Sequence, residues 1–295
     1  MQKNTKLTVT LNRCNCLLIL IILALAAGSL AHAQTSRFAA AYYNRGNDRY
    51  KKGDLDGAID DYNAALTFNP RWAVAYNMRG RARHGKGDLD GSIADYTRAI
   101  ELNPRLAVAY YNRGKARHDN GDLDGSIADY TSAIEISPRL NSAYNNRGNA
   151  RREKGDFEGA FDDLEKAVRI DPNNALVYNN RGLVRRAKGD MQAAIEDYDR
   201  AIKINPRLAE AYSNRGNARQ DKGDLGGSIA DYEFAIKIDP FFAKAYGNRG
   251  LARLYQGDQV GAEKDFEQCL RLDPKLKPLL EEQIVQAKQR LAARQ

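Results

Sequence analysis

Pairs of arginines recur along the chain with the second arginine four positions after the first, and both the residue type and the spacing suit anion chemistry. In "NNRGNARREKGD" (145–156) the pair is Arg147 and Arg151. Residues four apart lie on the same face of a helix, and a guanidinium binds a carboxylate through two parallel hydrogen bonds. Equivalent pairs are Arg45 and Arg49, Arg79 and Arg83, Arg113 and Arg117, Arg181 and Arg185, Arg215 and Arg219, and Arg249 and Arg253.

A partner for these arginines recurs with the same period. Asp163 follows Arg147 by 16 residues, and Tyr144 precedes it by three. A half-buried guanidinium is costly unless it is paired, and a tyrosine ring face also attracts it. We therefore favour an internal arginine–aspartate ladder built from Arg147, Arg151, Asp163 and their equivalents; the alternative is an anion-binding strip. The other aspartates are Asp61, Asp95, Asp129, Asp197, Asp231 and Asp265.

Asparagine precedes the first arginine of six pairs. A carboxamide offers both a donor and an acceptor, which matches a peptide unit of any sequence. Asparagine is also a mediocre helix former, so six of them in predicted helices indicate a role beyond packing. We favour contact with the main chain of a ligand over bridging between neighbouring units. The six are Asn44, Asn112, Asn146, Asn180, Asn214 and Asn248.

The elements that position these residues repeat every 34 residues, and prolines mark the unit ends. Within each unit, numbered here as positions 1–34, arginine holds positions 7 and 11 and aspartate position 23; asparagine holds position 6 in six units, and the second unit has Met78 there. Glycine at position 15 predicts the end of a first helix, and aspartate at position 16 predicts the cap of a second, which the proline at position 32 stops. The seven units are 39–72, 73–106, 107–140, 141–174, 175–208, 209–242 and 243–276.

This period and its pattern of large, small, aromatic and proline positions resemble the tetratricopeptide repeat family over residues 39–276. The resemblance implies an all-α fold: an α-solenoid, a right-handed superhelix of seven helix-turn-helix units with a concave groove lined by the first helices. It also implies that position 6 faces this groove, where asparagines can hold the main chain of an extended peptide. The arginines depart from the family, which favours leucine at position 7 and tyrosine at position 11.

Two short segments flank the units. Residues 277–295 are predicted to form a C-terminal capping helix, because Leu280, Ile284 and Ala287 recur on one face of a polar segment. Residues 34–38 are predicted to be a mobile segment outside the repeat.

Positions 9 and 12, which the resemblance also places in the groove, vary between units and are expected to set specificity. The middle of the groove is basic, because position 9 is Arg81 or Lys115 in two units and position 12 is Arg152 or Arg186 in two others. Such a groove suits a protein or extended peptide that carries acidic residues or a free carboxylate.

The first 33 residues have the pattern of a secretory signal peptide. A basic start precedes the apolar run "LLILIILALAA" (17–27), and "AHA" (31–33) supplies small residues for cleavage. We predict cleavage after residue 33 and an exported protein without a membrane span, in the periplasm of a Gram-negative cell or secreted; an uncleaved anchor is the alternative. The chain carries a net charge of +8, but an exported protein rarely meets nucleic acid, so none is expected as a partner.

No catalytic constellation stands out. The sequence has no glycine-rich phosphate loop and no HExxH motif, and its two histidines beyond the leader do not form a metal site, so no metal or cofactor is expected. We predict a non-enzymatic peptide-binding scaffold of the cell envelope. Two alternatives stay open: a self-assembling structural protein that forms homo-oligomers, and a regulatory partner of cell-wall or polysaccharide enzymes.

Overall fold

The computed structural model describes residues 34–293, and every regular element in that range is a helix. This confirms the all-α fold class. The predicted signal peptide lies outside the described residues. Within 34–293, no helix combines the length and the apolar character needed to cross a membrane.

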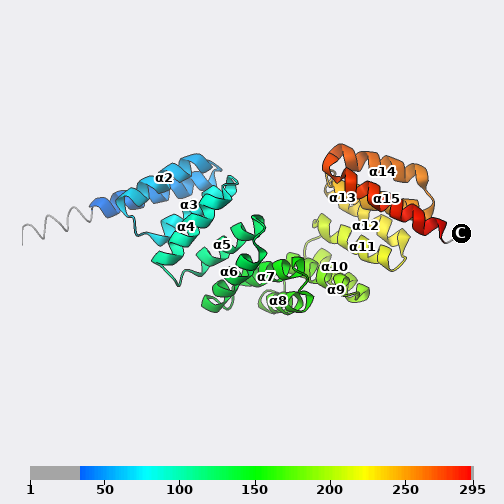
Figure 1. The fold of residues 1–295 in the computed structure, drawn as a ribbon, viewed down its shortest axis with the longest axis horizontal. Helices are drawn as coiled ribbons and strands as arrows, with labels where there is room; N and C mark the ends of the chain where they lie inside the picture. Colours follow the sequence, from blue (N-terminus) through cyan, green and yellow to red (C-terminus); the bar gives the residue numbers. More distant parts are fainter. Residues whose placement is uncertain (1–33, 294–295) are drawn as a thin grey trace, which may run out of the picture. The chain divides into compact units, whose positions relative to one another are not determined.

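The helices belong to two compact units that meet in sequence between Ile136 and Ser137 (Figure 1). The first contains a helix over residues 34–51, then α2 (Leu55–Phe68), α3 (Ala73–Gly85), α4 (Leu89–Leu102), α5 (Ala107–Asp119) and α6 (Leu123–Ile136). The second contains α7 (Asn141–Glu153), α8 (Phe157–Ile170), α9 (Ala175–Ala187), α10 (Met191–Ile204), α11 (Ala209–Asp221), α12 (Leu225–Ile238), α13 (Ala243–Gln256), α14 (Gln259–Leu272), a short 3₁₀ helix η1 (Pro274–Leu276) and α15 (Lys277–Ala292).

The turn inside each repeat forms as its sequence predicts. The glycine at position 15 adopts a left-handed conformation in all seven repeats, with φ between 81° and 88°. The aspartate that follows caps the second helix: Asp156, for example, accepts a hydrogen bond from the backbone N–H of Gly159 at 2.9 Å. These two residues fix where the first helix ends and the second begins.

The second helix ends slightly earlier than its proline suggests. In the first repeat α2 stops at Phe68, and Asn69 lies outside the helical region with φ −136° and ψ 84°. A residue before proline is disfavoured in the helical region, so the helix ends two residues before Pro70. Within residues 34–293, six later second helices also end at position 30.

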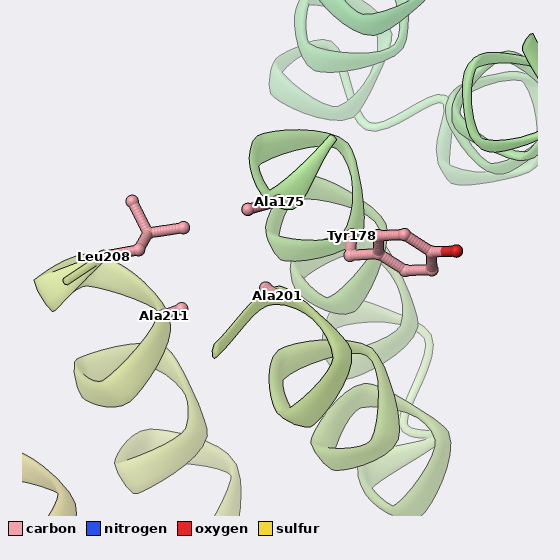
Figure 2. Packing of buried hydrophobic residues seen from close by; sticks show 5 residues of the cluster. All are labelled: Ala175, Tyr178, Ala201, Leu208 and Ala211. Carbon is pink, nitrogen blue, oxygen red and sulfur yellow. The ribbon is translucent and has the colours of Figure 1, made fainter. Parts of the chain in front are cut away.

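Small residues let neighbouring helices approach closely. Figure 2 shows Ala175 of α9 and Ala201 of α10 beside Leu208 and Ala211, which lie just before and within α11, and Tyr178 belongs to the same buried cluster. This cluster joins two repeats, because a helix pair alone cannot cover its own apolar face. Each repeat therefore depends on its neighbour for part of its core.

Glycine at position 8 is required by the packing of the two helices within a repeat. A Cβ atom on Gly182 would lie 2.6 Å from Cε1 of Tyr198, whose side chain is fully buried. Alanine at this position would therefore force the helices apart.

The two ends of the described chain differ from the sequence expectation in one respect. Residues 34–38 are helical and form the first turns of helix 34–51, and the ring of Phe38 contacts that of Phe68 with centroids 5.6 Å apart. At the other end α15 buries Leu280 and Ala287, with Ile284 and Leu291 packed beside them, which is the face predicted for a capping helix.

Candidate functional site

The arginines of each repeat converge on one buried aspartate. Arg147 donates through Nε and Nη2 to the two carboxylate oxygens of Asp163, at 2.9 and 2.6 Å. Arg151 donates through Nη1 to the same carboxylate at 2.8 Å and to the backbone carbonyl of Gly159 at 3.1 Å. Asp163 is 4% exposed, so two guanidinium groups compensate one carboxylate taken out of water.

This arrangement recurs in all seven repeats. Each arginine at position 7 pairs with the aspartate at position 23 of its own repeat. It also lies over the tyrosine ring at position 4, at 5.0 to 5.7 Å from the centroid. The second arginine reaches the same aspartate in every repeat.

The ladder also ties one repeat to the next. Nη1 of Arg79 donates to Asn63 Oδ1 at 2.7 Å, and Nη1 of Arg113 donates to Thr97 Oγ1 at 3.1 Å. Both acceptors hold position 25 of the preceding repeat. The position-7 guanidinium therefore donates through Nε and Nη2 to the aspartate of its own repeat. Its Nη1 donates to the preceding repeat.

Electrostatics agree with internal pairing. Burial acts to lower the pKa of Arg181, but the hydrogen bond and the charge of Asp197 outweigh it, so that pKa is raised. The forked edge of each position-7 arginine is filled by aspartate, which leaves no free fork for an external anion. The geometry thus favours the ladder over the anion-binding strip.

Three of the position-6 asparagines are hydrogen-bonded to the preceding repeat. Asn112, Asn180 and Asn214 each donate from Nδ2 to an asparagine at position 5 of the preceding repeat, at 2.9 to 3.0 Å. This is the bridging role that the sequence analysis ranked second. Asn146 is half-buried and has a partner, Asn44 is exposed, and Asn248 lines a small cavity.

The four predicted groove cations divide into two kinds. Arg186 pairs with Asp221 through Nε at 2.7 Å, and Arg152 pairs with Glu153 at 3.4 Å and with Asn149. By contrast, Arg81 and Lys115 are exposed and form no ion pair with any residue of 34–293. Two of the four predicted cations therefore have an acidic partner, and the other two have none among residues 34–293.

Arg81 and Lys115 meet in a cavity of about 360 Å³ in the first unit. Its lining contains no acidic side chain; it consists of Tyr50, Arg81, His84, Tyr96, Val108, Tyr111, Asn112 and Lys115. We call this cavity the basic pocket. The guanidinium of Arg81 lies over the Tyr50 ring, 5.1 Å from its centroid, which holds that cation at the pocket wall.

Other groups of the pocket are fixed by their neighbours. His84 Nε2 lies 2.8 Å from an oxygen of Asp119, and Asn112 donates to Asn77. Burial raises the pKa of Tyr96 well above its ordinary value, although the nearby Arg81 acts in the opposite sense. Tyr96 therefore stays a neutral hydroxyl that can donate a hydrogen bond, beside two cations that attract negative charge.

Sequence analysis missed the aromatic part of this pocket. Tyr50 holds position 12, Tyr111 position 5 and Tyr96 position 24, and they come from three successive repeats. Tyrosine occurs at position 12 in the first repeat alone and at position 5 in the first and third repeats, and this variation was the signal in the sequence. Only the stacking of repeats shows that they share one cavity with Arg81 and Lys115.

Comparison with known proteins agrees with this architecture. The family model described as "TPR repeat" matches residues 80–121, 114–151, 148–185 and 182–223. Models described as "Tetratricopeptide repeat" match 39–71, 209–242 and 243–276. The chain belongs to the tetratricopeptide repeat family. This fold is typical of protein–protein interaction. No curated protein matches the sequence.

Solved structures share the fold at low sequence identity. A tetratricopeptide repeat protein from Parabacteroides merdae aligns with a TM-score of 0.71 and 20% identity, over 84% of this chain and 99% of that one. The pilF protein of Pseudomonas aeruginosa aligns with a TM-score of 0.60 and 18% identity, over 68% and 92% of the two chains. A chain of the APC/C hetero-tetramer Cut9–Hcn1 gives 0.70 and 18%, over 83% of this chain and 48% of that one. This chain thus spans about half of the Cut9–Hcn1 chain that it matches.

Proposed function

We propose that this tetratricopeptide repeat protein is a non-enzymatic scaffold that binds an extended, acidic segment of another protein, and that an acidic side chain or terminal carboxylate enters the basic pocket. The observation that carries the proposal is the composition of that pocket. Arg81 and Lys115 project from successive first helices into a cavity lined by three tyrosines and no carboxylate.

The contrast with the ladder supports a binding role for the pocket. The protein surrounds each ladder arginine with carboxylate, carbonyl and ring acceptors, whereas it gives Arg81 and Lys115 no anionic partner within residues 34–293. A cation-lined cavity raises the local concentration of an anionic partner and speeds its association. Aromatic walls add apolar area without a large loss of side-chain freedom.

The bridged asparagines support a fixed surface for the peptide main chain. Asn112 uses Nδ2 to hold Asn77, and a carboxamide oxygen that accepts one hydrogen bond can accept another. A surface whose polar groups are held in place loses less freedom on binding. We therefore keep the groove asparagines as main-chain contacts, with the bridge as the device that orients them.

We also propose that the protein acts in the cell envelope, in the periplasm of a Gram-negative cell. The support is the leader sequence, with a basic start, an apolar run over 17–27 and small residues at 31–33. Cell fractionation of the natural host, with N-terminal sequencing of the recovered protein, tests this location. Recovery in the cytoplasm with residues 1–33 retained would contradict it.

A random octapeptide display library tests the binding proposal directly. We expect the protein to enrich peptides with aspartate, glutamate or a free C-terminus, and we expect the double variant Arg81→Gln/Lys115→Gln to lose that enrichment. The matched control is Arg105→Gln, which removes a positive charge from an exposed loop of the same unit. If the double variant and the unmodified protein enriched the same acidic peptides, the pocket would not be the binding site.

Affinity of a selected peptide gives the second readout. We expect each of Arg81→Gln and Lys115→Gln to weaken binding about five- to tenfold at low salt, as measured by fluorescence anisotropy. Raising the salt concentration should weaken binding to the unmodified protein and have less effect on the double variant, because exposed charges are screened within about 10 Å at 0.1 M ionic strength. Binding that salt does not change would argue against an electrostatic pocket.

A further inference from the structure

The first repeat exposes a helix face that the later repeats bury. On helix 34–51, Phe38, Ala41 and Arg45 lie three and four residues apart, which places them on one face. All three are exposed: Phe38 is 47% exposed and the Arg45 side chain 56%. We call these three residues the leading face.

The equivalent three positions at the start of the sixth repeat, one of them immediately before it, show what such a face normally contacts. They are Leu208, Ala211 and Arg215; Leu208 is 8% exposed, Ala211 is fully buried and the Arg215 side chain is 15% exposed. Figure 2 shows Leu208 and Ala211 packed against the helix ends of the preceding repeat. The leading face thus has the residues of an inter-repeat interface, with no described helix pair covering it.

The electrostatic part of that interface is also incomplete in the first repeat. Nη1 of Arg215 donates to Asp199, at position 25 of the preceding repeat, and Nη1 of Arg249 lies 3.8 Å from Glu233 at the equivalent position. Arg45 uses Nε and Nη2 for Asp61, as the other ladder arginines do. Its Nη1 has no acceptor among residues 34–293.

Aromatic side chains extend the exposed apolar area around this free donor. The ring of Phe68, which is 39% exposed, packs against Phe38 and stacks on Tyr42 at 5.8 Å. Contiguous exposed apolar surface on a soluble protein marks an interaction site. Here the apolar surface surrounds a guanidinium edge that, in Arg79, Arg113, Arg215 and Arg249, contacts position 25 of the preceding repeat.

We infer that the leading face binds an amphipathic helix of another protein, one that carries an aspartate or glutamate within an aliphatic stripe. Such a helix would take the place that α10 takes before the sixth repeat. Its carboxylate would accept from Nη1 of Arg45, and its aliphatic side chains would cover Phe38 and Ala41. This interaction is separate from the basic pocket and does not depend on the function proposed for it.

The chemistry of the bound helix follows from the interfaces within the chain. In α10, Asp199 is preceded by Ile195 and followed by Ile202; in α12, Glu233 lies between Ile229 and Ile236 with the same spacing. The shared pattern is isoleucine, an acid four residues later and isoleucine three residues after that. In the folded chain α10 and α12 already contact the following repeat, and α14 has Glu263 in place of the first isoleucine. A separate partner is therefore the better occupant than a second copy.

The α10 segment itself is a suitable probe. A helix-stabilised peptide covering residues 190–208, labelled with fluorescein, is titrated with the full chain and with its Arg45→Gln variant. We expect the variant to bind at least tenfold more weakly, and we expect the Asp199→Ala peptide to bind the unmodified protein with a similar loss. The charge-matched control, Arg105→Gln, should bind as the unmodified protein does.

A double-mutant cycle separates a direct Arg45–Asp199 pair from an indirect effect. If the two groups pair, the Arg45→Gln protein should show no further loss with the Asp199→Ala peptide, because interacting sites are not additive. Phe38→Ser, which leaves the pairing of Arg45 with Asp61 intact, should also weaken binding. This second variant keeps the test valid if Arg45→Gln disturbs the first repeat.

Four results would overturn the proposal. The first is no binding of the peptide up to millimolar concentration. The second is equal binding by the unmodified, Arg45→Gln and Phe38→Ser proteins. The third is concentration-dependent self-association that Arg45→Gln abolishes, measured by sedimentation velocity, which would assign the face to a second copy. The fourth is binding by the full chain and not by a chain that begins at Gln34, the mature form predicted above, which would assign the binding to residues 1–33.

Discussion

The ladder and the basic pocket are both built from cations, yet the chain treats the two sets differently. Arg147 is 12% exposed and its fork is filled by Asp163. Arg81 is exposed, and its guanidinium contacts a tyrosine ring and a methionine sulfur instead of a carboxylate. Residue type alone therefore does not tell a structural arginine from a binding one; the presence of a paired acid at a fixed place does.

This difference follows from where each position lies in the repeat. Positions 7, 11 and 23 lie between the two helices of one repeat, so each repeat can supply all three groups by itself. The pocket takes Tyr50 from the first repeat, Arg81 from the second and Lys115 from the third. Structural pairing is thus local and repeats seven times, whereas the pocket depends on a combination found once in the described chain.

The largest expected effect comes from breaking the ladder. Asp163→Ala leaves Arg147 and Arg151 partly buried without their carboxylate, so we expect the free energy of unfolding to fall by about 3–5 kcal/mol, as for other buried pairs that lose one partner. Urea titration followed by circular dichroism measures this loss.

Asp162→Ala is the matched control for that variant. Asp162 is exposed and adjacent in sequence to the buried Asp163, so its removal should change stability by no more than about 0.5 kcal/mol. Equal stability of the two variants would show that the ladder does not stabilise the fold, and the arginines would then need another role.

The second effect concerns the close approach of the two helices that carry the ladder. Gly182→Ala would place a Cβ atom 2.6 Å from the buried Tyr198 ring, and we expect a loss of about 1–3 kcal/mol, typical of overpacking. Gly226→Ala is the control, because no atom lies within 4 Å of its added Cβ. We expect that control to gain about 0.5–1 kcal/mol, since alanine favours helix more than glycine does. A loss of stability at both positions would show that helix spacing is not the cause.

The fold could be predicted well because its signals are local and repeated. Glycine at position 15 and aspartate at position 16 specify the turn within a few residues, and seven copies remove the ambiguity of a single motif. The ladder residues were found for the same reason: their spacing of 4, 12 and 16 residues is constant. The sequence analysis let the proline at position 32 stop each second helix, but the helix ends two residues earlier. The reason is that proline disfavours the helical conformation in the residue before it.

The candidate site was less predictable because it depends on contacts between repeats. Asn112 was expected to face a ligand, but its partner Asn77 lies 35 residues away at a position that varies. Arg186 was expected to make the groove basic, but Asp221 of the next repeat pairs with it. Which cations stay open is decided by the neighbouring repeat, and the sequence of one unit does not contain that information.

The third prediction compares two tyrosines at position 24 whose polar surroundings differ. The Tyr232 hydroxyl donates to Asn217 Oδ1 at 2.8 Å, whereas the buried Tyr198 hydroxyl has no partner among the described residues, because Leu183 holds the position of Asn217. We expect Tyr232→Phe to cost about 1 kcal/mol, the typical net value of one hydrogen bond. Tyr198→Phe should be neutral or stabilising, because it removes a buried unpaired group. Thermal unfolding of the two variants measures this difference in stability. An equal loss of stability in both would imply that the Tyr198 hydroxyl is hydrogen-bonded to a water molecule.

The smallest expected effect on stability belongs to the pocket cations, and it separates the two regions most clearly. Arg81→Gln and Lys115→Gln remove exposed charges that have no ion-pair partner within residues 34–293, so each should change the free energy of unfolding by less than about 0.5 kcal/mol. We expect a small gain at low salt, because Arg81 and Lys115 share one cavity and like charges repel. If either variant destabilised the protein as much as Asp163→Ala does, the pocket would be part of the structural framework, and the distinction between paired and open cations would fail.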